Sequence, residues 1–338
     1  MATILVFTYE PWEKDIYLSS LKDHQVVFFD GILSPETIPQ EAAQAEAISV
    51  FVDSVVTKEV IDAMPALRLI ATRSTGFDHI AIDAAKERGI TVSSVPAYGA
   101  NTVAEHAFGL LLALSKRIFD GYEQLRENGS YDPRALRGFD LNGKTLGVIG
   151  TGRIGQHAIK IGNGFGMKVI GYDAFPNKAL ESVYGFTYAE SLDELLAASD
   201  VISIHVPYLK ETHHMIHAGN IGTIKKGAVL INTSRGAVVE TEALFTALTD
   251  GYLRGAGLDV VEEEGFIKDE MHLLSEGALD THNLKVALIN HKLIDMPNVI
   301  MTPHSAFNTQ EALERILQTT IENITSYFKG TPQNNVIK

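Results

Sequence analysis

The feature that most constrains this chain is a glycine-rich turn between an apolar run and an amphipathic segment. Residues 146–149 form an apolar run short enough to be one buried strand, and residues 153–165 have the pattern of a helix. Three glycines follow the run in GxGxxG spacing: Gly150, Gly152 and Gly155. A second apolar run leads to Asp173, 23 residues after Gly150. A strand, this turn, a helix and an acid ending the next strand together predict a dinucleotide-binding unit.

Each residue type in this unit has a physical reason. Gly150 allows a sharp turn, Gly152 has no Cβ to keep a pyrophosphate from the backbone, and Gly155 lets the helix pack against its strand. The start of the helix directs free N–H groups and a positive dipole end at the phosphates. Asp173 can accept hydrogen bonds from both ribose hydroxyls and would repel a 2′-phosphate, so the predicted cofactor is NAD and not NADP.

Composition sets the broad class of protein. A chain of 338 residues with 45% hydrophobic residues is long enough for two domains. Its formal net charge of −14 argues against nucleic acid or an anionic membrane as a partner. There is no long apolar run and no basic signal segment, so we expect no membrane span and a cytoplasmic protein. The absence of cysteine excludes disulfides and thiol chemistry.

Apolar runs alternate with helix-prone segments on both sides of a long apolar helix expected at residues 101–119, which is typical of parallel α/β sheets. The runs before this helix are 2–7, 25–29, 47–52, 67–71 and 90–95. Those after the glycine-rich unit are 200–204, 228–232, 254–260 and 298–301, and an amphipathic helix is expected at 308–328. The fold class predicted is α/β, with two Rossmann-like or flavodoxin-like parallel-sheet domains and a cleft between them. Residues 261–290 interrupt the pattern and are expected to be an insertion with one or two short helices.

Chemically useful side chains follow the predicted strands of the second set. Arg235, Asp259 with the acidic residues 262–264, and His304 each lie at the end of an apolar run or within a few residues of it. Because ligands of open α/β sheets bind beyond the carboxyl ends of the strands, we expect these groups to converge beside the nicotinamide. Arg235 can bind a carboxylate and a carbonyl as a planar fork. His304 can give a proton to the carbonyl oxygen as hydride arrives, supported by a neighbouring carboxylate, so the pattern suits reduction of a 2-keto acid.

A metal site is not predicted. His213 and His217 are one helical turn apart, and His214 lies between them. No cysteine or carboxylate at a matching spacing completes a ligand set around them.

Several separate sequence motifs resemble those of the D-isomer-specific 2-hydroxyacid dehydrogenases. They extend over nearly the whole chain and occur in the same order as in that family. They are VPAYGANTVAEHAFGLLLAL, GVIGTGRIG, HVP, INTSRGAVV, GLDV and TPHSAF. Within the family the chain most resembles the fermentative D-lactate dehydrogenases, through Tyr98 in VPAY and Phe307 in TPHSAF. The chain differs from the family at Val261, where an aromatic residue is common, and in a longer segment between Asp259 and His304.

The resemblance implies roles for individual residues. Its catalytic arginine and histidine fall on Arg235 and His304, and the family's acid, five residues after the aspartate of LDV, falls on Glu264. The substrate carboxylate would bind backbone N–H groups around Thr75 and Gly76. The substrate side chain would meet Phe51, Tyr98 and Phe307. Cofactor contacts would come from Thr102, Gly150, Gly152, Arg153, Ile154, Gly155, Asp173, Val206, Pro207, Thr233 and Asp259.

The resemblance also implies an organisation. Residues 1–100 and 304–338 would form the substrate-binding domain and residues 101–303 the NAD-binding Rossmann domain, with a homodimer formed through the latter. The function expected is NAD-dependent reduction of pyruvate to D-lactate. One alternative is a D-2-hydroxyisocaproate-type dehydrogenase for larger 2-keto acids, and another is an NADH-sensing regulator on the same fold. The expected partner is a small 2-keto or 2-hydroxy acid.

Overall fold

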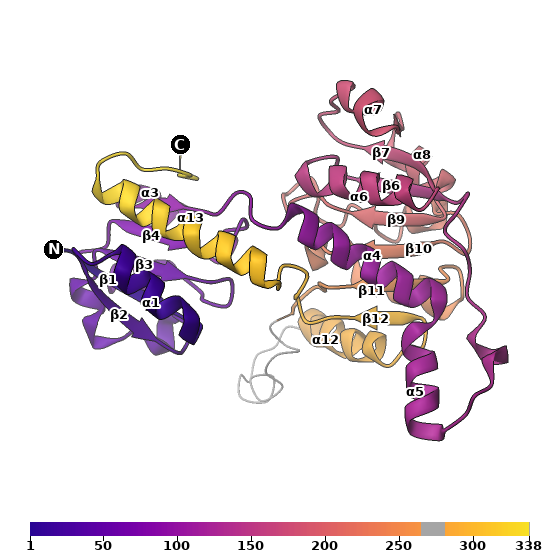
Figure 1. Cartoon of the computed structure of the whole chain (residues 1–338), viewed down its shortest axis with the longest axis horizontal. Coiled ribbons are helices and arrows are strands. Elements are labelled where there is room, and N and C mark those ends of the chain that lie inside the picture. The colour runs from indigo at the N-terminus through magenta and orange to yellow at the C-terminus, as the bar shows by residue number, and fades with distance from the viewer. Residues whose placement is uncertain (265–280, 338) are drawn as a thin grey trace. The chain divides into compact units, whose positions relative to one another are not determined.

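The chain forms two compact units. The computed structural model describes residues 1–264 and 281–337, with the backbone alone for residues 281–283. One unit consists of Met1–Tyr98 and Thr309–Lys338, and the other of Gly99–Asn308 (Figure 1). Each contains one sheet whose strand pairs are all parallel, which confirms the α/β fold class with two parallel-sheet domains. The sequence places the domain boundaries after residues 100 and 303, and the role of each unit stays a prediction.

The first unit has a five-stranded sheet in the order β2-β1-β3-β4-β5, the flavodoxin-like order. Its strands are β1 (Thr3–Phe7), β2 (Gln25–Phe29), β3 (Ala47–Val50), β4 (Leu69–Thr72) and β5 (Thr91–Ser93). Its helices are α1 (Pro11–Ser20), α2 (Lys58–Asp62), α3 (Ile82–Glu87) and α13 (Gln310–Phe328). Alternate residues of one strand enter different cores, Leu5 on one face and Ile4 on the other, where it meets Leu317 of α13. Helices on both faces explain why these strands are apolar throughout.

The second unit has a seven-stranded sheet in the order β12-β11-β10-β9-β6-β7-β8. Its strands are β6 (Thr145–Ile149), β7 (Lys168–Tyr172), β8 (Thr187–Tyr188), β9 (Val201–Ile204), β10 (Val229–Asn232), β11 (Gly255–Leu258) and β12 (Val299–Met301). Its helices are α4 (Ala100–Lys116), α5 (Ile118–Asn128), α6 (Arg153–Gly164), α7 (Ala179–Tyr184), α8 (Leu192–Ala198), α9 (Thr241–Thr249) and α12 (Thr281–Ile294). Figure 1 shows α4 and α6 across one face of this sheet.

The strand order reverses between β6 and β9. At such a point the connections that follow the two neighbouring strands run on opposite faces of the sheet. The carboxyl ends of the two strands therefore leave a crevice in which a ligand can bind. The glycine-rich turn follows β6 and His205 follows β9, so both lie at this point. The fold therefore places the dinucleotide motif where a Rossmann sheet binds its cofactor.

The long helix expected at residues 101–119 is shorter in the structure. Helix α4 ends at Lys116, and Arg117 adopts a left-handed conformation with φ of 52° before α5 begins. The apolar pattern continues through this break, so periodicity alone does not reveal it. The short strand β8 was not expected either. Of the insertion expected at 261–290, residues 265–280 lie outside the described residues, and α12 covers the end.

Short 3₁₀ helices complete the connections: η1 (Pro35–Thr37), η2 (Gln40–Gln44), η3 (Pro133–Leu136), η4 (Ile221–Thr223) and η5 (Gly236–Val238). No helix in the described part of the chain is long and apolar enough to cross a membrane.

Candidate active site

The glycine-rich turn has the geometry that a bound pyrophosphate needs. Gly150 has φ of 88°, and a Cβ on it would lie 2.7 Å from the His205 carbonyl oxygen. A Cβ on Gly155 would lie 2.0 Å from the Gly150 carbonyl oxygen, so α6 can approach its strand only with glycine there. A Cβ on Gly152, the residue before α6, would meet no described atom within 4 Å. Space therefore remains in front of the helix N-terminus, where phosphates bind favourably.

Asp173 lies directly after β7 and is held in place by its neighbours. Its Oδ2 accepts hydrogen bonds from the Thr151 backbone N–H at 2.8 Å and from the Thr151 hydroxyl at 3.1 Å. Its Oδ1 accepts one from the Phe175 N–H at 2.9 Å. A carboxylate can accept about four hydrogen bonds, so capacity remains for a ribose hydroxyl. Asp173 is partly exposed, and an acid that binds a ribose must be accessible in this way.

His205 contributes a neutral group beside this turn. Its Nε2 lies 2.9 Å from the Ser203 hydroxyl, and its Nδ1 is buried without a hydrogen-bond partner among the described residues. Burial lowers the pKa of His205 to about 4, because a charged imidazole would lose its hydration there. The ring therefore carries no charge at neutral pH.

The remaining predicted cofactor residues lie in the same unit. Arg153 and Ile154 begin α6, Thr102 is buried in the first turn of α4, and Val206 and Pro207 follow His205. Thr233 follows β10, and its buried hydroxyl has no hydrogen-bond partner among the described residues. An orphaned hydroxyl at a strand end fits a polar cofactor. The glycine turn, Asp173 and Thr233 together fit NAD, although the contacts of individual residues with it stay predictions.

A buried asparagine shapes the turn that carries Arg235. Asn232, 1% exposed at the end of β10, accepts hydrogen bonds at its Oδ1 from the Ser234 N–H at 3.0 Å and hydroxyl at 2.8 Å. Its Nδ2 donates to the Arg235 carbonyl at 3.0 Å. The Arg235 Nη1 donates to the Ser234 carbonyl at 2.8 Å. The guanidinium is thus partly buried and anchored on one side.

Asp259 organises the loop that carries His304. Its Oδ1 accepts hydrogen bonds from the Thr302 hydroxyl at 2.5 Å and the Ser305 N–H at 2.9 Å, and its Oδ2 accepts one from the Ala306 N–H at 2.9 Å. Burial favours the neutral acid, but hydrogen bonds from His106, Thr302 and the loop backbone outweigh it and lower the pKa of Asp259. The buried carboxylate therefore remains charged and holds the loop in one conformation. Its predicted contact with the cofactor stays a prediction.

His304 and Glu264 form a close pair. The His304 Nδ1 lies 2.8 Å from the Glu264 Oε2, and the two side chains are 26% and 25% exposed. The His304 backbone has φ of 50°, a left-handed conformation that is costly for a residue with a side chain. Its N–H donates to the Asp259 carbonyl at 2.9 Å, which stabilises that conformation. A cavity of about 220 Å³ beside the pair is lined by apolar atoms of Ile294 and Met301, among others.

The two neighbouring glutamates have other environments. The Glu262 Oε1 lies 2.6 Å from the His214 Nε2, and its Oε2 accepts a hydrogen bond from the Thr241 N–H at 2.7 Å. Glu263 is exposed and has φ of 54°. Of the three adjacent acids, Glu264 is therefore the one that the structure joins to His304.

The predicted substrate residues are divided between the units. Phe51, Thr75, Gly76 and Tyr98 belong to the first unit, and Phe307 belongs to the second with the catalytic candidates. The loop at Thr75 and Gly76 is braced by two hydrogen bonds, from the Thr75 hydroxyl to the Val95 carbonyl at 2.7 Å and from the Ser74 hydroxyl to the Gly76 carbonyl at 2.6 Å.

The backbone N–H groups of Thr75 and Gly76 have no acceptor among the described residues. Two adjacent donors of this kind can bind a carboxylate. The placement of this loop with respect to Arg235 and His304 stays a prediction.

Sequence reasoning did not assign the residues that hold the site together. They are Asn232, which bonds the turn of Arg235; His106 and Thr302, which lie beside Asp259; and His214, which contacts Glu262 in the acidic loop of residues 262–264. The His106 Nε2 lies 3.0 Å from the Thr302 hydroxyl and 3.4 Å from the Asp259 Oδ1. For Asn232 the available signal was its position, since a polar residue that is buried at a strand end needs partners.

An arginine, an imidazole paired with a carboxylate and a dinucleotide turn, all in one Rossmann unit, define the class of this protein as an NAD-dependent dehydrogenase. The comparisons with known proteins support this class. The sequence model described as D-isomer specific 2-hydroxyacid dehydrogenase, NAD binding domain, matches residues 108–306. A 2-hydroxyacid dehydrogenase homolog of Zymomonas mobilis is 39% identical over 91% of this chain and 90% of its own.

Solved structures of similar proteins agree. A D-lactate dehydrogenase from Aquifex aeolicus, complexed with NAD and lactic acid, has a TM-score of 0.87 and 40% identity, over 99% of each chain. A D-2-hydroxyisocaproate dehydrogenase has a TM-score of 0.82 and 30% identity, over 99% of this chain and 100% of its own. The chain belongs to the D-isomer-specific 2-hydroxyacid dehydrogenase family. It is an oxidoreductase that acts on the CH–OH group of D-2-hydroxy acids, and its cofactor is NAD.

Proposed function

We propose that this enzyme reduces pyruvate to D-lactate with NADH, and that His304 is its general acid and base. The observation that carries the proposal is the 2.8 Å contact between the His304 Nδ1 and the Glu264 Oε2. Because Nδ1 faces the carboxylate, Nε2 is the ring atom left to exchange a proton with substrate. The Aquifex aeolicus neighbour, complexed with lactic acid, supports a substrate of this size.

The reaction needs two events at the keto group. NADH, held by the glycine-rich turn and Asp173, would supply the hydride to the carbonyl carbon. The Nε2 of a protonated His304 gives its proton to the carbonyl oxygen, which becomes the hydroxyl of lactate. Glu264 stabilises the imidazolium and fixes the ring orientation through Nδ1, and Arg235 binds the substrate carboxylate and carbonyl through two parallel N–H groups.

The same proposal assigns the first unit to substrate binding and the second to NAD. The free N–H groups of Thr75 and Gly76 support carboxylate binding by the first unit. The substrate methyl would contact Phe51, Tyr98 and Phe307. The glycine turn and the family match over residues 108–306 support NAD binding by the second unit.

A second candidate is a dehydrogenase for larger, branched 2-keto acids. The D-2-hydroxyisocaproate dehydrogenase neighbour favours it, because that enzyme matches 99% of this chain at 30% identity. The two candidates share the reaction and the catalytic residues. They differ in the volume available to the substrate side chain.

Steady-state oxidation of NADH against a panel of 2-keto acids would test both. We expect the highest kcat/KM with pyruvate, a lower value with 2-ketoisocaproate and a product of D configuration. A higher kcat/KM with 2-ketoisocaproate would favour the second candidate. If no 2-keto acid accelerates NADH oxidation, the proposed reaction is wrong.

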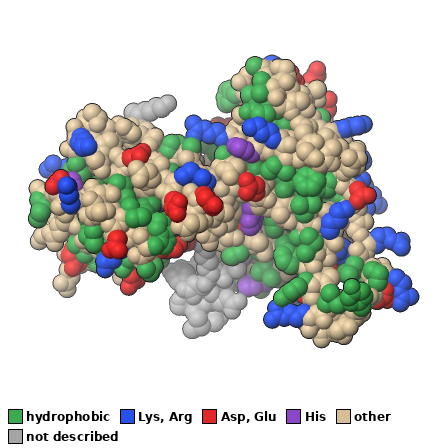
Figure 2. Space-filling view, viewed as in Figure 1, with side chains coloured by type: hydrophobic (Ala, Val, Ile, Leu, Met, Phe, Trp, Pro, Cys, Tyr) green, Lys and Arg blue, Asp and Glu red, His purple; other side chains and the backbone are tan. Residues whose placement is uncertain are grey.

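We also propose a cytoplasmic homodimer. Hydrophobic side chains gather on the surface over α5 (Figure 2), among them Ile118, Phe119, Tyr122 and Leu125, which are 53%, 51%, 56% and 50% exposed. An exposed apolar cluster of this kind is typical of an association surface. Light scattering on the purified protein should give twice the chain mass of 36.9 kDa, and Phe119→Glu should shift it to the monomer.

A further inference from the structure

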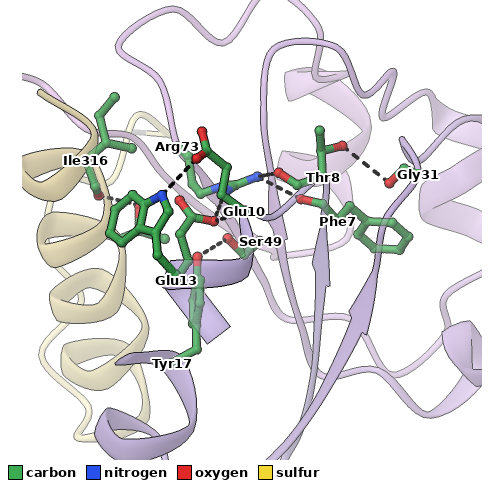
Figure 3. Close-up of polar contacts among 11 residues, drawn as sticks. Phe7, Thr8, Glu10, Glu13, Tyr17, Gly31, Ser49, Arg73 and Ile316 are labelled. Atoms are coloured by element: carbon green, nitrogen blue, oxygen red, sulfur yellow. Dashed lines mark hydrogen bonds and ion pairs between the residues drawn. The ribbon is translucent and has the colours of Figure 1, made fainter. Parts of the chain in front are cut away.

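A buried ion pair lies at the carboxyl edge of the first unit's sheet. The Arg73 Nη1 donates to the Glu13 Oε2 at 2.8 Å, and the two residues are 3% and 4% exposed (Figure 3). Glu13 is itself fixed, because the same oxygen accepts the Glu10 N–H at 3.0 Å at the start of α1. Removing one partner of such a pair is destabilising, because the other charge is left buried and unpaired. The intact pair, however, often stabilises a fold no more than an apolar pair of the same volume would. The contribution of the pair therefore lies in the geometry that it fixes.

Arg73 joins the ends of three neighbouring strands. Its Nη2 donates to the Phe7 carbonyl at 2.7 Å and to the Thr8 carbonyl, at the end of β1. Its backbone N–H donates to the Val50 carbonyl at 2.8 Å, at the end of β3. Arg73 itself directly follows β4. Arg73, which directly follows β4, thus contacts the end of β1 through its guanidinium and the end of β3 through its backbone N–H.

The same side chain supports the predicted substrate contacts. The Arg73 Cζ lies 5.5 Å from the centre of the Phe51 ring, within the range of a cation–π contact. Arg73 also lies two residues before Thr75, whose backbone N–H is predicted to bind the substrate carboxylate. Both predicted contacts, to the carboxylate and to the side chain, therefore start from one anchored residue.

We propose that Arg73, held by Glu13, is the positioning residue of the substrate site. It fixes the Phe51 ring and the loop at Thr75 and Gly76 without touching substrate. This inference rests on the proposed function, since it assigns these residues to a 2-keto acid. It predicts that disturbing the pair weakens substrate binding and leaves NADH binding in the other unit unchanged.

Arg73→Lys is the direct test, because lysine keeps the charge but has no planar guanidinium. A single ammonium cannot donate to Glu13 and to two carbonyls and also keep the contact with the Phe51 ring. We expect the KM for pyruvate to rise by about tenfold and kcat to change by less than about threefold, as for a misplaced binding loop. The dissociation constant of NADH, from fluorescence titration, should be unchanged. Hydrogen exchange should increase at residues 50–54 and 73–79 and not across the whole sheet.

Tyr17→Phe is the matched control. It removes the buried hydrogen bond between the Tyr17 and Ser49 hydroxyls, 2.9 Å apart, in the same unit and one helical turn from Glu13. It should lower Tm without changing the KM, so a general loss of stability can be recognised. If folded Arg73→Lys keeps the wild-type KM within about twofold, the proposal is overturned.

If Arg73→Lys does not fold, Glu13→Gln decides. Glutamine preserves the volume and one acceptor oxygen for Nη1, so we expect a smaller rise in KM, of about threefold. An unchanged KM in that variant also overturns the proposal. Activity of the wild-type enzyme on the 2-keto acid panel tests the proposed function separately. The hydrogen-exchange pattern tests the positioning role without depending on enzyme activity.

Discussion

Glu264→Gln should weaken keto-acid reduction by about an order of magnitude. A hydrogen bond to a charged group contributes about 1.5–3 kcal/mol and one between neutral groups about 0.5–1.5 kcal/mol. Glutamine keeps the shape and an acceptor at the 2.8 Å contact with the His304 Nδ1, so the loss is the difference between the two. The corresponding ends of the two ranges differ by about 1–1.5 kcal/mol, and because both side chains are about one-quarter exposed, at 26% and 25%, we take no larger spread. A loss of about 1–1.5 kcal/mol corresponds to about a 5- to 15-fold fall in kcat/KM.

The assay is steady-state NADH oxidation with pyruvate at neutral pH, for the variant and two controls. Glu263→Gln removes the same charge at an exposed neighbour and should stay within about twofold of wild type. Glu262→Gln keeps one acceptor oxygen for the Thr241 N–H, and its amide NH2 can donate to the Nε2 of a neutral His214, so its main effect should be on Tm. If Glu264→Gln keeps the wild-type kcat/KM and Glu262→Gln lowers it, the wrong carboxylate has been assigned to His304.

Three further variants test other parts of the site. Asp173→Ala should raise the ratio of kcat/KM with NADPH to that with NADH by about tenfold or more, because it removes a ribose acceptor and the charge that repels a 2′-phosphate. Arg235→Lys should lower kcat/KM by about 100-fold, since an ammonium cannot make two parallel hydrogen bonds, and near-normal kinetics would contradict this. The pKa of His205 falls from 6.5 to about 4 in the folded protein, so the unfolded chain binds more protons in that window. Stability should therefore fall by about 3 kcal/mol as pH drops from about 6.5 to about 4, and denaturant titrations of His205→Gln should lack this slope.

Local patterns in the sequence were enough to predict the fold and the cofactor turn. The strands β6 and β7 and the helix α6 between them are marked by apolar runs, and Gly150 and Gly155 are needed by the backbone itself. Such features depend on residues near one another in the chain, so a single sequence reveals them. The break at Arg117 was not predictable, because the apolar face of α4 and α5 continues across it.

Pairs that are distant in sequence could not be derived in the same way. His304 and Glu264 are separated by 40 residues, and Arg73 and Glu13 by 60. The position of Glu264 relative to Asp259 came from a family resemblance and not from any physical property of the loop. Nothing in the sequence indicated that Arg73 would be buried, since arginine is mostly an exposed residue.

The acidic loop shows how three identical side chains acquire different roles. Six described residues other than glycine have left-handed backbones, and three of them belong to the acidic residues 262–264 or to their histidine partners: His214, Glu263 and His304. Such conformations are costly and persist where surrounding contacts hold them. Glu262 supplies such contacts to His214 and to the Thr241 N–H, and the left-handed Glu263 then turns the chain. Glu264 is thereby directed to His304, so the role of each acid follows from the loop conformation and not from its chemistry.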